Sequence, residues 1–176
     1  SDPHPEMSGR DLDDIADELG LSPLEAMEKL MPGGAIYFMM DEADIDRIMT
    51  SENAMIGSDG LPEDAHPHPR LWGTFPRVLG HYVREKQLMP LYDAVHRMTG
   101  LSAGNFMLKD RGLIMPGYYA DITIFDPDTV IDKATYEKPK QYASGIEVVI
   151  VNGQIAWQNG SASGARAGKV LKRTVA

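Results

Sequence analysis

Apolar residues recur with the period of an α-helix in the first third of the chain. They lie three and four residues apart over residues 12–19, and Gly20 is placed to end that helix. Ser22-Pro23-Leu24-Glu25 then combines an N-cap serine, proline at the first helical position and glutamate three residues after the cap. The pattern predicts two short helices, the second of which is stopped by the Pro-Gly-Gly sequence at residues 32–34.

Two short apolar runs follow, at residues 35–40 and 54–57, and a helix is expected between them after Asp41. Continuous apolar runs are typical of strands that are buried on both faces of a parallel sheet. Their separation of about 20 residues fits a strand–helix–strand crossover unit. We therefore predict a parallel α/β unit in this part of the chain.

The periodicity changes beyond about residue 107. Amphipathic helices are expected after Pro76 and from Pro90, whereas apolar and polar residues alternate over residues 120–125, as in a strand. Asn152-Gly153 lies between two further apolar stretches and is a strong signal for a β-hairpin turn. We predict two parts, an α/β segment at residues 1–106 and a β segment at residues 107–176.

The charge and composition exclude several classes of protein. The chain of 176 residues has a formal net charge of −9 and 0 cysteines. Because phosphate groups are bound by cationic side chains, we expect binding neither to nucleic acid nor to an anionic membrane. The lack of cysteine excludes disulfides and cysteine-ligated zinc, and it fits a reducing compartment, so we expect a cytoplasmic location.

The chain opens on the polar stretch Ser1-Asp2-Pro3-His4, which lacks the basic and apolar regions of a signal peptide. It also has no initiator methionine. We expect from this start that the chain was cut from a longer protein.

Asp59 is the strongest candidate for a catalytic residue. It directly follows the apolar run at residues 54–57 and lies between Ser58 and Gly60. If that run is a parallel strand, the carboxylate lies at the strand's C-terminal end, where barrel and open α/β enzymes place their chemistry. The alternative is an aspartate that only stabilises a turn.

Two further features lie in the proline-rich loop after Asp59. Arg70 has the guanidinium fork that suits bidentate recognition of a carboxylate, although a surface salt bridge is its ordinary role. His66-Pro67-His68 has the spacing of a zinc-binding pair, but histidines flanked by prolines are more often plain loop residues.

Several longer motifs resemble the N-acyl-D-amino-acid deacylases (D-aminoacylases) of the amidohydrolase superfamily, and together they span nearly the whole chain. Those that carry the resemblance are Gly34-Ala35-Ile36-Tyr37-Phe38-Met39-Met40, Met55-Ile56-Gly57-Ser58-Asp59-Gly60-Leu61-Pro62, His68-Pro69-Arg70-Leu71-Trp72-Gly73-Thr74-Phe75-Pro76-Arg77-Val78-Leu79-Gly80, Lys109-Asp110-Arg111-Gly112, Gly117-Tyr118-Tyr119-Ala120-Asp121 with Phe125-Asp126-Pro127, and Val151-Asn152-Gly153. The last two are the weaker ones, because many amidohydrolases share them.

The resemblance implies a TIM-type (β/α)₈ barrel with a β-sandwich built from both ends of the chain. Residues 1–106 would supply the C-terminal part of the barrel, with residues 35–40 and 54–57 as strands seven and eight, and residues 107–176 would supply most of the sandwich. A complete barrel needs about 250 residues, so we expect a partial enzyme that is inactive alone.

The resemblance also implies roles for the two candidate residues in zinc-dependent hydrolysis of N-acyl-D-amino acids. Asp59 would bind the metal weakly or through its water, take a proton from that water and later protonate the leaving amine. Arg70 would hold the carboxylate of the small N-acyl amino acid substrate. The other metal ligands of the family, which include a His-x-His motif at an earlier strand, have no counterpart here, and His66-Pro67-His68 is not that motif.

Two alternative readings stay open. The substrate could be a cyclic amide, as in hydantoinase-like or dihydroorotase-like amidohydrolases, although the Arg70-Leu71-Trp72-Gly73 stretch speaks against this. The chain could also be a non-catalytic fragment that needs a partner chain. An open barrel edge beside residues 35–40 would then favour self-association.

Overall fold

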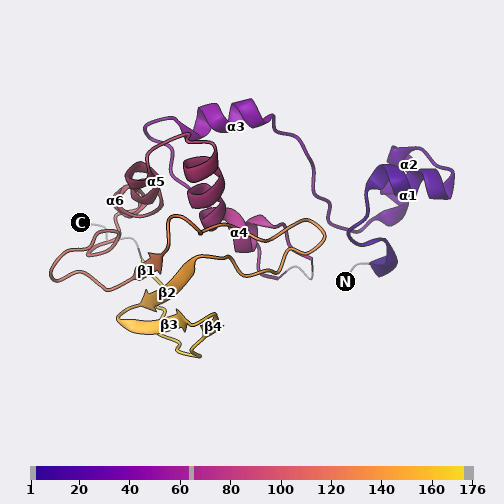
Figure 1. Cartoon of the computed structure of the whole chain (residues 1–176). Helices are drawn as coiled ribbons and strands as arrows, with labels where there is room; N and C mark the ends of the chain where they lie inside the picture. Colours follow the sequence, from indigo (N-terminus) through magenta and orange to yellow (C-terminus); the bar gives the residue numbers. More distant parts are fainter. Residues whose placement is uncertain (1–2, 64–65, 173–176) are drawn as a thin grey trace.

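The computed structural model describes residues 3–63 and 66–172 and shows helices at one side of a small antiparallel sheet (Figure 1). The helices are α1 Leu12–Leu19, α2 Pro23–Leu30, α3 Glu42–Met49, α4 Arg70–Arg77, α5 Leu91–Met98 and α6 Gly100–Asn105. A 3₁₀ turn at Pro5–Met7 precedes them, and a π-helix at Val78–Glu85 continues α4. The strands are β1 Ile122–Phe125, β2 Ile146–Val151, β3 Gln154–Gln158 and β4 Ser161–Ala162.

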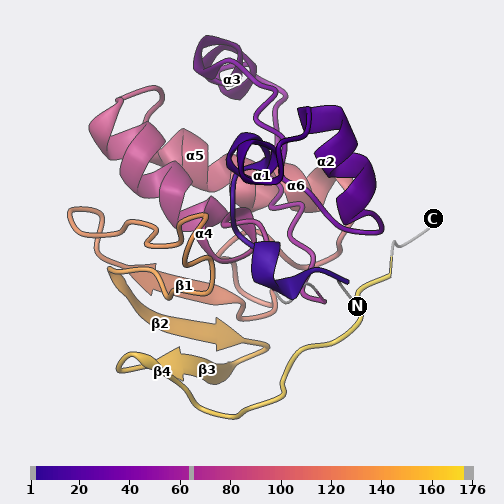
Figure 2. The same cartoon turned by 90° about the vertical axis from the view of Figure 1, so that its right-hand side faces the viewer.

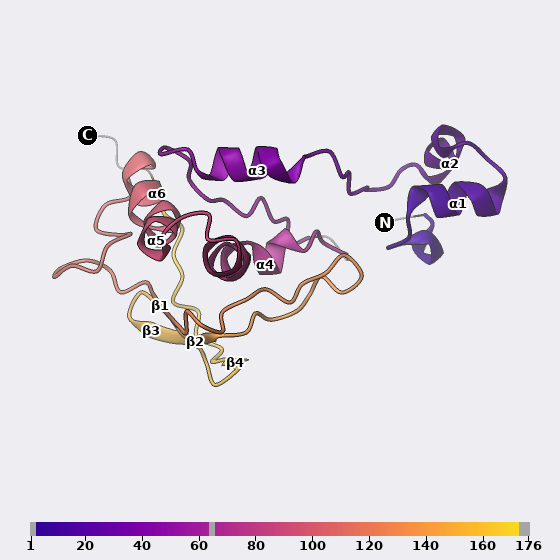
Figure 3. The same ribbon diagram turned by 45° about the horizontal axis from the view of Figure 1, so that its top comes forward.

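The two predicted N-terminal helices are confirmed, together with their end signals. Gly20 ends α1 in the left-handed conformation at φ 65°, and Ser22 begins α2 with the reciprocal capping box that involves Glu25. Figure 3 shows α1 and α2 at the end of an extended connection, away from the other helices. No helix in residues 3–63 or 66–172 is both long and apolar enough to cross a bilayer.

The predicted strands at residues 35–40 and 54–57 are not formed. Both segments lie outside regular structure, and the first exposes large apolar side chains, with Phe38 at 74% and Met39 at 82% exposure. A buried parallel strand needs neighbours that pair with its N–H and C=O groups. The part of the chain described here supplies no such neighbour, so only the helix between the two segments, α3, appears as predicted, capped by Asp41.

The hydrophobic core of the helical part lies between the π-helix and α5. Val78, Met89 and Ala94 are buried there, and Ile56 packs against them. Ile56 also donates its N–H to the carbonyl of Arg97 at 3.4 Å, so residues 54–57 lie on α5 although they form no strand. The segment that leads into Asp59 is thereby fixed to the core.

Arg97 is a buried cation that joins α5 to the end of α3. Its side chain is 5% exposed and pairs with Asp93 one turn earlier, Nη2 to Oδ2 at 2.9 Å. It also donates to the carbonyls of Met49, at 2.9 Å, and Ser51. One side chain therefore holds α5 against the end of α3 through three acceptors.

The β segment is a four-stranded antiparallel sheet in the order β1-β2-β3-β4. Asn152 and Gly153 both have positive φ, 47° and 79°, as the two-residue turn predicted between β2 and β3 requires. Figure 2 shows the sheet as a layer beside α4–α6. Arg111 links this hairpin to the preceding loop through Asp121 and through Asn152 Oδ1 at 2.7 Å.

We predict that Arg97→Ala lowers the free energy of unfolding by about 2–3 kcal/mol, because it removes a buried guanidinium together with its pair to the half-buried Asp93 and its bonds to two carbonyls. Arg47→Ala, which removes an exposed pair with Asp44 on α3, should change it by about 1 kcal/mol or less. Chemical denaturation of both variants tests this. If both variants lower the free energy of unfolding by the same amount, the contacts of Arg97 do not stabilise the fold more than an exposed ion pair does.

Candidate functional site

Asp59 lies in an irregular segment, with its side chain accessible. Its φ is 48°, in the left-handed region that aspartate tolerates better than most residues. The side chain is 81% exposed. The carboxylate is thus open to a ligand, although the strand that was predicted to precede it is not formed in the described residues.

The structure brings the two predicted site residues together. Arg70, the first residue of α4, pairs with Asp59 through Nη2 and Oδ2 at 2.7 Å. Its Nε–H also donates to the main-chain carbonyl of Asp59 at 2.9 Å. The guanidinium is 41% exposed, so a carboxylate and a cation stand side by side at an accessible surface.

Gly60 lets the loop approach the start of α4. A Cβ at this position would lie 2.6 Å from Leu71 Cδ1 and 2.7 Å from Leu71 Cα, which no side chain could accept without a shift. The Gly60 N–H also donates to Ser58 Oγ at 3.4 Å. Asp59 is therefore held against α4 by the packing of its neighbour as well as by Arg70.

The two loop histidines have structural partners. His68 Nδ1 accepts the main-chain N–H of Arg70 at 3.0 Å, and His66 Nε2 donates to the carbonyl of Tyr136 at 2.5 Å. The Tyr136 ring packs edge-on against His68 and Phe38, with centroids 5.3 and 4.9 Å apart. These contacts favour the plain reading of His66 and His68 as loop residues over a zinc-binding pair.

Tyr136 was missed by the sequence analysis. It lies in the loop between β1 and β2, about 70 residues after the histidine that it contacts. No periodicity, spacing or motif marks such a contact. An irregular loop from the second part of the chain thus packs, through Tyr136, against the loop that carries His66 and His68.

Burial in this cluster lowers the pKa of His68 below its ordinary value, and the positive charge of Arg70 lowers it further. The negative charge of Asp59 opposes the shift but does not cancel it. His68 therefore stays neutral more readily than a free histidine, which suits its role as an acceptor of the Arg70 N–H.

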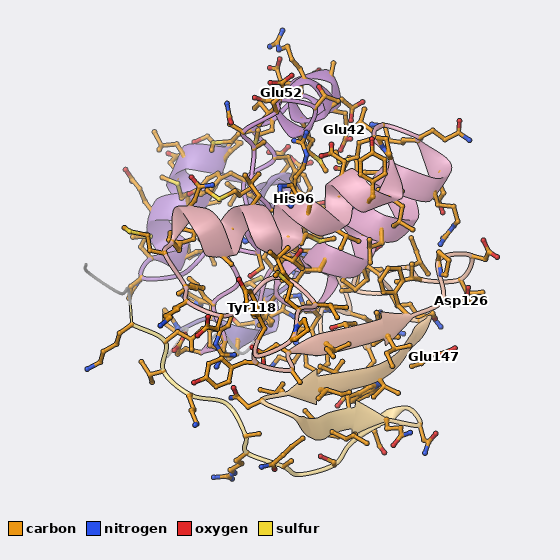
Figure 4. The ribbon with its side chains drawn as sticks, turned by 90° about the vertical axis from the view of Figure 1, so that its left-hand side faces the viewer. Glu42, Glu52, His96, Tyr118, Asp126 and Glu147 are labelled. Atoms are coloured by element: carbon orange, nitrogen blue, oxygen red, sulfur yellow. The ribbon has the colours of Figure 1, made fainter. Side chains whose placement is uncertain are left out.

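The described residues do not form a metal site by themselves. Among residues 3–63 and 66–172, no three His, Asp or Glu side chains lie close enough to hold one ion. In Figure 4 the labelled acidic side chains do not gather in one place, because Glu42 and Glu52 lie in and just after α3, whereas Asp126 follows β1 and Glu147 lies on β2. Asp59 could serve only as one ligand among others that this part of the chain does not supply.

Comparison with known proteins shows which family this chain belongs to. A model of the amidohydrolase family matches residues 6–156. D-aminoacylase of Alcaligenes xylosoxydans xylosoxydans is 56% identical over 174 residues, which are 99% of this chain and 36% of that protein. N-acyl-D-glutamate deacylase of the same organism is 50% identical over 173 residues, 98% of this chain and 35% of its own length. The chain thus spans about a third of the relatives it matches.

Solved structures agree with the fold. A crystal structure of D-aminoacylase matches with a TM-score of 0.93 and 57% identity, over 97% of this chain and 36% of that one. A structure of N-acyl-D-glutamate deacylase from Bordetella bronchiseptica, complexed with zinc and a phosphonate inhibitor, matches with a TM-score of 0.91 and 52% identity, over 99% and 36%. The helices and the antiparallel sheet are therefore part of an amidohydrolase fold, and the resemblance seen in the sequence is confirmed.

We predict that His68 titrates below pH 6.5 in an NMR experiment, and that Arg70→Ala moves its midpoint upward. Because the folded state favours neutral His68, the associated stability is full above the ordinary pKa of 6.5 and is lost as the pH falls toward the folded pKa. His68→Asn should abolish that pH dependence. A midpoint at or above 6.5 in the unsubstituted protein would contradict the description of this cluster.

Proposed function

The chain belongs to the amidohydrolase family, and on that premise we propose that it supplies the C-terminal part of a zinc-dependent deacylase that hydrolyses N-acyl-D-amino acids. The observation that carries the proposal is the contact between the exposed Asp59 carboxylate and the Arg70 guanidinium. The reaction needs a group that moves a proton and a group that recognises a carboxylate. Asp59 and Arg70 offer these two groups side by side in one ion pair.

Asp59 is the proton carrier in this proposal. Its accessible carboxylate accepts a proton from the attacking water and returns it to the nitrogen of the leaving amino acid. Arg70 binds the carboxylate of the substrate, because a guanidinium offers parallel N–H donors that match the two carboxylate oxygens. A cyclic amide without a carboxylate could not form this ion pair with Arg70.

Zinc, when bound in the intact enzyme, would supply a water whose pKa is lowered to about 7 and would polarise the scissile carbonyl. Since the described part of this chain gathers no three ligands, we propose that most of the metal site is supplied by the two thirds of the relatives' length that this chain does not span. Asp59 is the one ligand that we assign to this chain. The chain alone is therefore proposed to be inactive.

The exposed apolar segment at residues 35–40 supports a larger fold. We propose that it and residues 54–57 become strands of a (β/α)₈ barrel once neighbouring strands pair with them, and that residues 107–176 belong to a β-sandwich. Pairing of this segment would then bury side chains that are exposed in this structure, those of Ile36, Phe38 and Met39. A cytoplasmic location and self-association through this segment remain predictions.

In the full-length enzyme, Asp59→Asn should lower kcat by at least about 100-fold on an N-acetyl-D-amino acid, because asparagine cannot carry a proton. Zinc content, measured by mass spectrometry, should stay substantial, since other residues hold most of the ion. Asp44→Asn removes another exposed carboxylate that is paired with an arginine and should leave kcat unchanged. Near-normal turnover in Asp59→Asn would exclude the proton-transfer role.

Arg70→Ala should raise KM for N-acetyl-D-amino acids by about 10- to 100-fold, the equivalent of one charged hydrogen-bonded pair. Steady-state kinetics on the full-length enzyme measure this. An unchanged KM would show that the substrate's carboxylate is bound elsewhere.

A further inference from the structure

Arg70 holds two different oxygen atoms of Asp59 at once. Nε donates to the main-chain carbonyl at 2.9 Å, and Nη2 contacts the carboxylate oxygen Oδ2 at 2.7 Å. The guanidinium is planar and its donors are fixed relative to one another, so this fork defines the direction of the Asp59 side chain relative to its own backbone. A single-point contact could not do so.

From this fork we infer that Arg70 is a positioning residue for Asp59, in addition to its proposed role in binding the substrate. The inference rests on the proposed function and deepens it. The Asp59 side chain is 81% exposed and its backbone has a positive φ, so neither burial nor regular structure restrains it. Arg70 supplies that restraint from the first turn of α4, which continues into the buried core at Val78.

The fork also leaves donors for a ligand. Nη1 makes no hydrogen bond to any residue within 3–63 or 66–172, and it lies on the opposite edge of the guanidinium from Nε. A substrate carboxylate can bind there while Asp59 stays in place. Arg70 then fixes the distance between the carboxylate of the substrate and the group that moves the proton, which favours substrates whose carboxylate is on the carbon next to the scissile amide nitrogen.

The test separates positioning from binding by removing the carboxylate from the substrate. The full-length enzyme is assayed on an N-acetyl-D-amino acid and on the corresponding N-acetyl-D-amino acid amide, with Arg70→Ala, Arg70→Lys and the control Arg47→Ala. Arg47 also forms an exposed ion pair, but on α3. If Arg70 only binds the substrate's carboxylate, its removal cannot slow hydrolysis of the neutral amide.

We expect kcat/KM on the neutral amide to fall about 10- to 100-fold in Arg70→Ala, which is the scale of a misplaced catalytic group. Arg70→Lys should fall similarly, because lysine keeps the charge but not the fork. Arg47→Ala should match the unsubstituted enzyme on both substrates. Unchanged hydrolysis of the amide in both Arg70 variants, with a raised KM for the acid, would overturn the positioning role and leave the proposed function intact.

Failure of the proposed function has a different signature, since the unsubstituted enzyme would then hydrolyse neither substrate. A further outcome is that the amide is turned over too slowly to measure while the acid is hydrolysed. In that case a crystal structure of full-length Arg70→Ala shows whether Arg70 positions Asp59. Displacement of the Asp59 carboxylate from its position in the unsubstituted enzyme supports the inference. An unmoved carboxylate overturns it.

Discussion

Asp59 keeps its place because the loop that carries it lies in direct contact with the start of α4. Gly60 allows this contact, since a Cβ there would fall 2.6 Å from Leu71 Cδ1, and Arg70 closes it with its two donors. Helix α4 continues into the π-helix, whose Val78 lies in the core with Ala94. The position of Asp59 therefore depends on the packing of one helix in the core and not on a sheet.

The features that the sequence predicted correctly depend on neighbours in the chain. The capping box of Ser22 and Glu25 and the turn at Asn152-Gly153 are set by backbone geometry within a few residues, so their patterns can be read directly. Asp59 and Arg70 were both predicted as site residues, but their ion pair was not predicted and is a finding of the structure. Their catalytic roles come from the family resemblance and remain to be tested.

The features that the sequence could not predict depend on partners far away or absent. Residues 35–40 have the composition of a buried strand, but composition does not provide the neighbouring strands that would pair with their backbone. The contact between His66 and Tyr136 joins two irregular loops and leaves no periodic trace. Arg97 shows its pairing with Asp93 in the i, i+4 spacing, but not its bonds to the carbonyls after α3.

The most direct test of the central claim is a crystal structure of the full-length enzyme bound to an analogue of the tetrahedral intermediate of amide hydrolysis. We expect one Asp59 carboxylate oxygen within about 3.2 Å of the oxygen that represents the attacking water. Arg70 should contact the carboxylate of the same ligand. An Asp59 side chain that points into solvent, with the ligand bound by other residues, would contradict the account.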